Sequence, residues 1–319
     1  MKKLVLISAY FGKLPECFNL WLLSAAENKD IDFLLYSDCD FKQYLPLPEN
    51  VKVIPVSFEE MKEKFRSKFD FEIVLDTPYK LCDYKPAYGY VLQEDIKDYS
   101  FWGHIDIDTV LGNILKFLPD DEYDKYYILG HLCIYRNTEE NNCRFKLDGG
   151  MDYKWVFTTK TVCIFDEVGG MQKKYNLHKI PSYVSRDYAD ITKRKHRFTL
   201  SYAFNELYKT PVINYEYQVF YYENGGVFRD YIENGEIKTE EFNYIHFSSR
   251  SLPDKTDGCR AFYITNSGFY PKNEKVTKEI IEKYNPLSPE LDKKADRKWK
   301  IFDVKLKIRR KLIRIKEKL

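Results

Sequence analysis

The sequence lacks the short motifs that would assign a function directly. It contains neither a G-x-G-x-x-G run nor a G-x-x-x-x-G-K-[ST] run, so a dinucleotide-binding fingerprint and a phosphate-binding P-loop are both absent. Its seven cysteines are scattered, odd in number and never spaced C-x-x-C, which favours reduced thiols in a cytosolic protein over a disulfide framework. No stretch reaches the ~18 apolar residues that a membrane-spanning helix requires.

A signal peptide is not indicated either. Lys2 and Lys3 precede an apolar run, but Lys13 and Glu16 interrupt the pattern and no small-x-small cleavage site follows, so we expect a buried first strand. The composition, 44% hydrophobic and 31% charged over 319 residues, is that of a globular protein with one large domain or two closely joined halves. The 27 tyrosines would suit stacking on sugars and nucleotides, although core packing also uses tyrosine.

Charge is distributed unevenly along the chain. The net charge is +2, but residues 293–319 hold 13 Lys/Arg and 3 Asp/Glu, so this tail carries +10 and the remaining residues sum to −8. Apolar residues at spacings of 3 and 4 form one helical face: Ile301, Val304, Ile308, Leu312, Ile315 and Leu319. The pattern predicts a linker over 286–297 and a basic amphipathic helix over 298–319. We expect the helix to bind an anionic membrane surface. The alternatives are docking onto the acidic body of the protein or onto another subunit.

The first 115 residues alternate between strand-like and helix-like segments. Apolar runs predict strands over 3–9, 33–36 and 51–56, and helical spacing predicts helices over 18–26, 58–69 and 87–97. A further strand carries Asp106 and Asp108. This alternation predicts a doubly wound, mostly parallel sheet, in which ligands bind beyond the carboxyl ends of the strands. The second half is less regular, with strands predicted over 126–134, 156–165, 212–222 and 244–247 and a helix over 277–284.

The segment 101–108, Phe-Trp-Gly-His-Ile-Asp-Ile-Asp, is the most informative part of the sequence. Side chains at i and i+2 of an extended segment point the same way, so Asp106 and Asp108 repel each other unless a cation lies between them. A hard divalent cation prefers oxygen ligands and often binds phosphates. The pair therefore predicts a metal-dependent site for a nucleotide sugar. A solvated turn is the alternative, because the same spacing occurs at Asp30/Asp32 and Asp38/Asp40.

Other residues could complete a site for a nucleotide-diphosphate sugar. The first turn offers backbone groups and an aromatic face for the base: Ala9, Tyr10, Phe11 and Gly12. Asp38 could hold the base or the ribose, and Lys85, with Lys80 nearby, could neutralise phosphate as a point charge. Each candidate also has a structural alternative. Residues 9–12 could be a plain strand-to-helix turn, Asp38 could cap a helix or stabilise a turn, and the lysines could lie in a solvated loop.

Later segments carry further candidates. His246 ends an apolar run and could be a third metal ligand, with Arg250 on a phosphate. A packing role is the alternative, as it is for His131. Asp166 and Glu167 end another apolar run and are candidates for the general base that deprotonates an acceptor hydroxyl. A helix start or a turn would account for them equally well.

These segments resemble a family of bacterial glycosyltransferase-like proteins found in capsule and exopolysaccharide gene clusters, with a GT-A type of fold. The resemblance covers roughly residues 3–250 and rests on six segments in order: 9–15, 80–86, 101–108 with Gly112, 130–137, 165–167, and His246 with Arg250. It implies that Asp106 and Asp108 form a metal- and diphosphate-binding motif for Mn²⁺ or Mg²⁺, and that His246 is a late-chain metal ligand. His104 and Ile105 stand where the family more often has Tyr-Cys.

We therefore expect an α/β fold with a GT-A-like (Rossmann-like) mixed sheet, flanking helices and a carboxyl-terminal basic helix. Residues 1–115 would bind a nucleotide sugar, with a UDP-sugar as the expected donor, and residues 116–285 would form the acceptor side. The expected activity is metal-dependent glycosyl transfer, of the hexosyltransferase class, to a lipid-linked surface-polysaccharide acceptor. We expect a cytoplasmic enzyme, peripheral on the inner face of the plasma membrane, with no nucleic-acid partner.

Two other classes of function are compatible with these residues. One is a non-catalytic carbohydrate-binding or membrane-scaffold protein that retains the GT-A fold. The other is a nucleotidyltransferase or phosphatase that uses the same acidic pair, which the missing Gly-rich phosphate loops disfavour.

Overall fold

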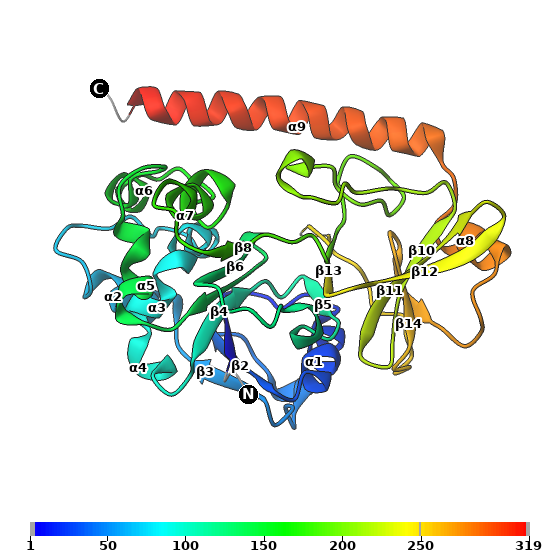
Figure 1. Ribbon diagram of the computed structural model, residues 1–319, viewed down its shortest axis with the longest axis horizontal. Helices are drawn as coiled ribbons and strands as arrows, with labels where there is room; N and C mark the ends of the chain where they lie inside the picture. Colours follow the sequence, from blue (N-terminus) through cyan, green and yellow to red (C-terminus); the bar gives the residue numbers. More distant parts are fainter. Residues whose placement is uncertain (1–3, 249, 317–319) are drawn as a thin grey trace.

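The computed structural model describes residues 4–248 and 250–316, which form three β-sheets with helices packed around them (Figure 1). The strands of the largest sheet are β1 (Leu4–Ala9), β2 (Ile31–Ser37), β3 (Val51–Pro55), β4 (Phe101–Ile105), β6 (Lys125–Leu129), β7 (Leu132–Arg136) and β8 (Ser182–Tyr183). Their order is β3-β2-β1-β4-β7-β6-β8. Neighbours from β3 to β4 run parallel, whereas β7 runs antiparallel to both β4 and β6. The predicted mixed α/β class is confirmed.

Alternating side chains of β1 cover the two faces of this sheet. Val5 and Ile7 belong to the core that contains α2 (Phe58–Arg66), whereas Leu4 and Leu6 belong to the core that contains α1 (Phe18–Glu27). α2 begins at Ser57, which forms a capping box with Glu60. Both helices lie where the apolar spacing predicts them, so the sheet is covered on its two faces.

Short helices cover the α2 face of the sheet (Figure 1): α3 (Tyr88–Val91), α4 (Gln93–Ile96), α5 (Glu139–Cys143), α6 (Tyr153–Thr158) and α7 (Lys173–Leu177). Short 3₁₀ segments, one ten-residue 3₁₀ segment and one π-helical segment complete the connections: η1 (Lys42–Tyr44), η2 (Pro78–Ala87), η3 (Leu115–Phe117), η4 (Arg144–Lys146), η5 (Val168–Gln172) and η6 (Asn205–Leu207). The helix predicted over 87–97 is instead α3 and α4, because the backbone leaves helical geometry at Leu92 (φ −104°, ψ 23°).

Two strand predictions in the second half are wrong. The predicted strand 126–134 is a hairpin, because the chain turns at Gly130 and His131 between β6 and β7. The predicted strand 156–165 begins inside α6, which Asp152 caps by accepting a hydrogen bond from the backbone N–H of Lys154 at 2.9 Å. A short apolar run fits a buried helix as well as a buried strand, so periodicity alone could not separate them.

A second sheet is antiparallel and has five strands: β10 (Gln218–Glu223), β11 (Gly226–Glu233), β12 (Glu236–Phe242), β14 (Phe262–Thr265) and β15 (Gly268–Pro271). Their order is β12-β11-β10-β14-β15, and β10 starts later than the strand predicted from residue 212. Phe220 and Phe262 pack in one core with Leu20 of α1, which joins this sheet to the first. Tyr221 packs with Ile281 of α8 (Lys278–Tyr284), the helix predicted over 277–284.

A three-stranded sheet lies between the two larger ones (Figure 1). β13 (Tyr244–His246) pairs with β5 (Thr109–Leu111) on one side and with β9 (Ala189–Asp190) on the other. The predicted boundary at residue 115 therefore does not separate two sheets, since β6, β7 and β8 complete the first sheet and β13 pairs with β5. This pairing brings three segments that are distant in sequence to one place.

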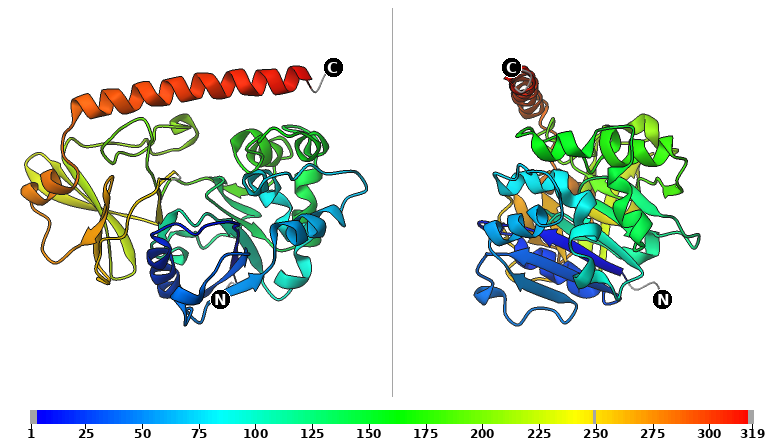
Figure 2. Two further views of the ribbon diagram at one scale, coloured as in Figure 1. Left: turned by 180° about the vertical axis from the view of Figure 1, so that it is seen from behind. Right: turned by 90° about the vertical axis from the view of Figure 1, so that its left-hand side faces the viewer.

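The chain ends in one long helix, α9 (Pro289–Lys316), which runs along the outside of the molecule (Figures 1 and 2). The predicted linker 286–297 is wrong from residue 289 onward, because that part is already helical. The helix predicted over 298–319 is confirmed to Lys316, and residues 317–319 lie outside the described residues. Among the described residues, no helix combines the length and the apolar character that crossing a membrane requires.

Candidate functional site

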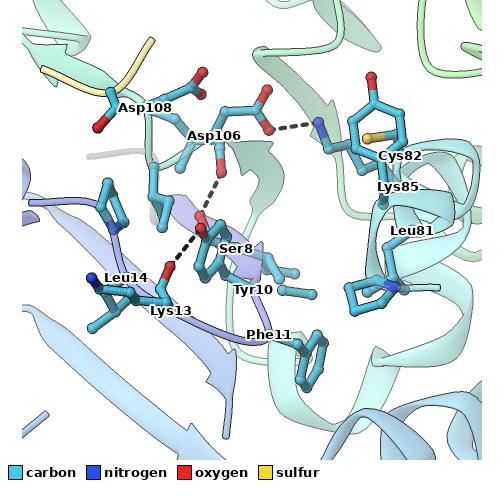
Figure 3. Close-up of a pocket in the computed structure, with 18 of the residues that line it drawn as sticks. Ser8, Tyr10, Phe11, Lys13, Leu14, Leu81, Cys82, Lys85, Asp106 and Asp108 are labelled. Atoms are coloured by element: carbon cyan, nitrogen blue, oxygen red, sulfur yellow. Dashed lines mark hydrogen bonds and ion pairs between the residues drawn. The ribbon is translucent and has the colours of Figure 1, made fainter. Parts of the chain in front are cut away.

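A pocket of about 600 Å³ lies where the parallel neighbours β1 and β4 end (Figure 3). Residues that follow β1 form one wall, residues of η2 form another, and residues that follow β4 lie between them. The lining includes Tyr10, Phe11, Tyr79, Cys82, Lys85, Asp106, Asp108 and Arg250. The carboxyl edge of a parallel sheet is where ligands bind in α/β proteins, so the pocket lies where the sequence predicts it.

Asp106 and Asp108 lie in the short connection between β4 and β5, because β4 ends at Ile105. The prediction that a strand carries both residues is therefore wrong, although their position at a strand end is confirmed. Backbone hydrogen bonds fix the connection: the N–H of Asp106 donates to the carbonyl of His131 at 3.0 Å, and the carbonyl of Asp108 accepts from the N–H of Phe247 at 3.0 Å. Both carboxylates thus occupy defined positions at the pocket (Figure 3).

His246 joins this pair from β13. Its Nε2 lies 3.4 Å from Oδ2 of Asp108, and one potential ligand atom each from Asp106, Asp108 and His246 lie within 4.8 Å of one another. Two carboxylates and an imidazole are a donor set that suits Mn²⁺ and related divalent cations. Burial alone lowers the pKa of His246, but Asp108 and Asp190 outweigh burial and raise it to about 10.

Asp190 and His131 contact the parts of the His246 ring that do not face Asp108. Oδ1 of Asp190 lies 2.9 Å from Nδ1 of His246, and the ring of His131 stacks on that of His246 with centroids 4.5 Å apart. Nδ1 of His131 lies 2.6 Å from the hydroxyl of Tyr244, while its Nε2 has no hydrogen-bond partner among the described residues. Burial, helped by His246, lowers the pKa of His131 to about 3, so this imidazole is neutral. These residues form a second group with ligand atoms within 4.8 Å: His131, Asp190 and His246.

Sequence reasoning did not find Asp190. It lies in β9, a strand of two residues with no periodic pattern, and its role depends on the pairing of β9 with β13. Burial raises the pKa of Asp190, but His246 outweighs burial and lowers it to about 2. Tyr79, at the pocket edge and 70% exposed, also went unnoticed, because a single tyrosine in a turn carries no signal in a chain so rich in tyrosine.

Lys85 lines the pocket but is already paired. Its Nζ lies 2.6 Å from Oδ1 of Asp106 and 3.5 Å from Oδ2 of Asp166, and it donates to the carbonyl of Gly130 at 2.8 Å (Figure 3). Burial lowers the pKa of Lys85, yet these carboxylates outweigh it and hold the pKa well above its ordinary value. The geometry places Lys85 as the group that holds Asp106.

Lys80 is buried, and its Nζ lies 2.7 Å from Oδ2 of Asp83. Lys80 is not among the described lining residues of the pocket, so the interpretation of Lys80 as a phosphate contact is wrong.

Asp166 and Glu167 lie behind the pocket and are not among its described lining residues. Asp166 is buried beside Lys85, whereas Glu167 is partly exposed and its Oε1 accepts from the N–H of Gly130 at 3.4 Å. A Cβ atom at Gly130 would lie 2.2 Å from Oδ2 of Asp166, so only glycine fits at this turn. Burial raises the pKa of both carboxyls, and Asp166 raises that of Glu167 further.

The first turn and Arg250 complete the predicted set. Ala9, Tyr10, Phe11 and Arg250 line the pocket, but Gly12 and Asp38 are outside its described lining. Oδ1 of Asp38 instead accepts from the N–H of Gly12 at 3.1 Å, which makes it an anchor for this turn. Arg250 donates from Nη1 to the carbonyls of Phe247 and Ile191 and from Nη2 to that of Thr192. Burial lowers the pKa of its guanidinium to about 10.

Comparison with known proteins identifies a family whose function is unknown. A family model described as "Family of unknown function (DUF6625)" matches residues 6–273, which include nearly all of the three sheets and all the site residues described above. A search of curated proteins finds no match to the sequence.

Proposed function

The chain belongs to the DUF6625 family, and we propose that it is a metal-dependent glycosyltransferase with a GT-A-like fold. The reaction would move a sugar from a nucleotide-diphosphate donor, with a UDP-sugar as the first candidate, to a surface-polysaccharide acceptor. One observation carries the proposal: Asp106, Asp108 and His246, from two distant segments, converge beside a pocket of about 600 Å³ at the carboxyl edge of a parallel sheet.

The pocket offers what a nucleotide-diphosphate sugar needs. Tyr10 and Tyr79 line it and present aromatic surface for the base. Asp106 and Asp108 line the same cavity, where the diphosphate of a bound donor would meet them through a cation (Figure 3). The backbone of the first turn, held by Asp38, gives the donor a rigid boundary.

Mn²⁺ or Mg²⁺ fits the donor set of Asp106, Asp108 and His246. Such an ion would offset the charge that develops on the leaving diphosphate, which is Lewis-acid chemistry. Asp190 accepts at Nδ1 of His246 and thereby directs Nε2 toward Asp108. A carboxylate that orients a ligating imidazole in this way fixes its tautomer and raises its basicity.

An inverting reaction also needs a base for the acceptor hydroxyl. Of the two carboxylates that the sequence indicated, Asp166 is buried beside Lys85, and only Glu167 is partly exposed. We therefore assign the base to Glu167 and a structural role to Asp166. Burial and the neighbouring Asp166 raise the pKa of Glu167 to about 8, so Glu167 would act as the base where it is ionised, and it would then be a stronger base toward a hydroxyl than an ordinary carboxylate.

Nucleotide-sugar binding and turnover test this proposal together. Thermal shifts of the full chain are measured with a panel of nucleotide sugars, each with and without Mn²⁺, because a bound donor stabilises the folded state by mass action. We expect a metal-dependent shift with one donor class, followed by metal-dependent hydrolysis or transfer of the same donor. Binding without turnover would favour the non-catalytic carbohydrate-binding or scaffold protein, and the absence of both would overturn the proposal.

A further inference from the structure

The first turns of α9 contact the loop at residues 193–197, which follows Asp190 of the candidate site. Oδ1 of Asp292 accepts from the backbone N–H groups of His196 at 2.8 Å and of Arg197 at 3.3 Å. Farther along the helix, Nζ of Lys193 lies 5.6 Å from the ring centroid of Trp299. These contacts therefore fix where α9 begins on the protein and the direction in which it runs along the outside of the molecule (Figure 1).

Beyond these contacts, large apolar side chains of α9 remain exposed. The exposed fractions are 50% for Ile301, 50% for Phe302, 55% for Val304 and 54% for Ile308. Ile301, Val304 and Ile308 are spaced by three and four residues, so they share one face of the helix. Contiguous exposed apolar surface of this kind marks an interaction site rather than an ordinary surface.

The charge of the same segment selects the partner. Residues 298–316 hold nine Lys/Arg and one Asp. Two copies of this segment packed side by side would bring like charges together, whereas an anionic lipid surface attracts them and accepts the apolar face. The body of the protein is acidic, but it leaves the described apolar side chains of this segment about half exposed, so it does not cover them.

We propose that α9 binds the surface of an anionic membrane through the apolar face at Ile301, Val304 and Ile308 and the basic residues around it. The attachment also sets the direction of the pocket. The loop that receives α9 continues from Asp190, and the carbonyl of Thr192 accepts from Arg250, whose side chain lines the pocket. A helix lying on lipid would hold the edge of the pocket at a fixed distance from the surface, as a lipid-linked acceptor requires.

Vesicle co-sedimentation of the full chain tests the proposal. The vesicles are phosphatidylcholine alone or phosphatidylcholine with one-third phosphatidylglycerol, at low and at physiological salt. The test variant carries Ile301→Ser, Val304→Ser and Ile308→Ser. The matched control carries Ile237→Ser, Leu207→Ser and Ile213→Ser, which change equally large and comparably exposed apolar side chains elsewhere.

We expect binding to the anionic vesicles only, weaker at higher salt, with the α9 variant reduced by about tenfold or more and the control unchanged. Circular dichroism and the melting temperature of both variants exclude misfolding as the cause. Equal binding by the α9 variant, or no binding of the unmodified chain at low salt, would overturn the proposal. A dimer in light scattering that the α9 variant abolishes would assign the face to a second copy instead. Because the readout is binding, it does not depend on the proposed glycosyl transfer.

Discussion

Lys85 and Asp106 form an ion pair of 2.6 Å at the boundary between the pocket and the protein interior. The ammonium group of Lys85 holds one of the two carboxylates, that of Asp106, without a metal ion, so Asp106 is in place before any ligand arrives. Lys85 also lies 3.5 Å from Asp166 and thereby links the pocket to the buried carboxylates behind it.

Lys85→Met should therefore destabilise the protein strongly. The substitution leaves Asp106 and Asp166 without their cation in a largely buried position, which costs about 3–5 kcal/mol of unfolding free energy. Urea unfolding gives the value, and Lys97→Met, which removes an exposed partner of Glu94 at 3.7 Å, should change stability by less than about 0.5 kcal/mol. A loss below about 1 kcal/mol for Lys85→Met would show that the pair is not structural.

Asp108→Asn should weaken divalent-cation binding by at least about tenfold, because the position loses one hard anionic ligand and keeps its shape. It should also lower the melting temperature of the metal-free protein near neutral pH, because Asp108 helps to keep His246 protonated. Calorimetric titration of Mn²⁺ measures the affinity. Asp40→Asn is the control, since Asp40 shares the same spacing with Asp38 but caps an exposed turn at the backbone N–H of Lys42. Equal Mn²⁺ affinity in Asp108→Asn and in the unmodified chain would remove Asp108 from the site.

His246 should make stability depend on pH in a predictable direction. Its pKa is raised from 6.5 to about 10, so the protonated imidazole stabilises the metal-free protein fully below pH 6.5, and this contribution is lost as pH rises toward 10. The metal-free protein should therefore lose more stability over this window than His246→Gln. Mn²⁺ binding should release a proton in the same window, so affinity should rise with pH. Parallel pH profiles of the two proteins would refute the assignment.

Glu167→Gln should lower the rate of transfer, whereas Asp166→Asn should lower stability. Loss of the base in Glu167→Gln should slow transfer by roughly two to four orders of magnitude with little change in donor affinity. Asp166→Asn should act mainly on stability, because this carboxylate is buried beside Lys85. Initial rates at saturating donor, with melting temperatures, separate the two effects. Normal rates in both variants would mean that neither residue is the base.

Gly130→Ala should destabilise the turn between β6 and β7, because the added methyl group would lie 2.2 Å from a carboxylate oxygen of Asp166. We expect a cost of about 1–3 kcal/mol, the usual range for overpacking. Gly169→Ala is the control, since its methyl group would meet only the flexible end of Met151 at 3.2 Å. Equal stability of the two variants would mean that Asp166 moves freely.

Local patterns predicted the first half of the chain well. β1, α1, β2, β3 and α2 lie within a few residues of their predicted ranges, because each has apolar residues at the period of its own element. The patterns failed where a local signal fits two structures. Residues 126–134 are apolar except for Gly130 and His131, and only the turn at these two residues divides the segment into two strands.

The site could be predicted in part for the same reason. The spacing of Asp106 and Asp108 at the end of an apolar run indicates them as candidates. The position of His246 at the end of another apolar run does the same. Asp190 could not be found, because its contact with His246 arises from the pairing of β9 with β13 and from nothing in its own segment. The buried pairing of Lys85 was likewise hidden, since a sequence does not show which lysines are enclosed by carboxylates.

The small sheet in which β13 lies between β5 and β9 has a consequence for biosynthesis. During translation β5 leaves the ribosome long before β13, so Asp106 and Asp108 spend most of that time without His246. A nascent or truncated chain that ends before residue 246 presents two carboxylates and no imidazole, and it should not retain a cation that needs all three. If the proposed metal site exists, its affinity would thus appear only after β13 has joined β5, so unfinished chains would not take up the ion.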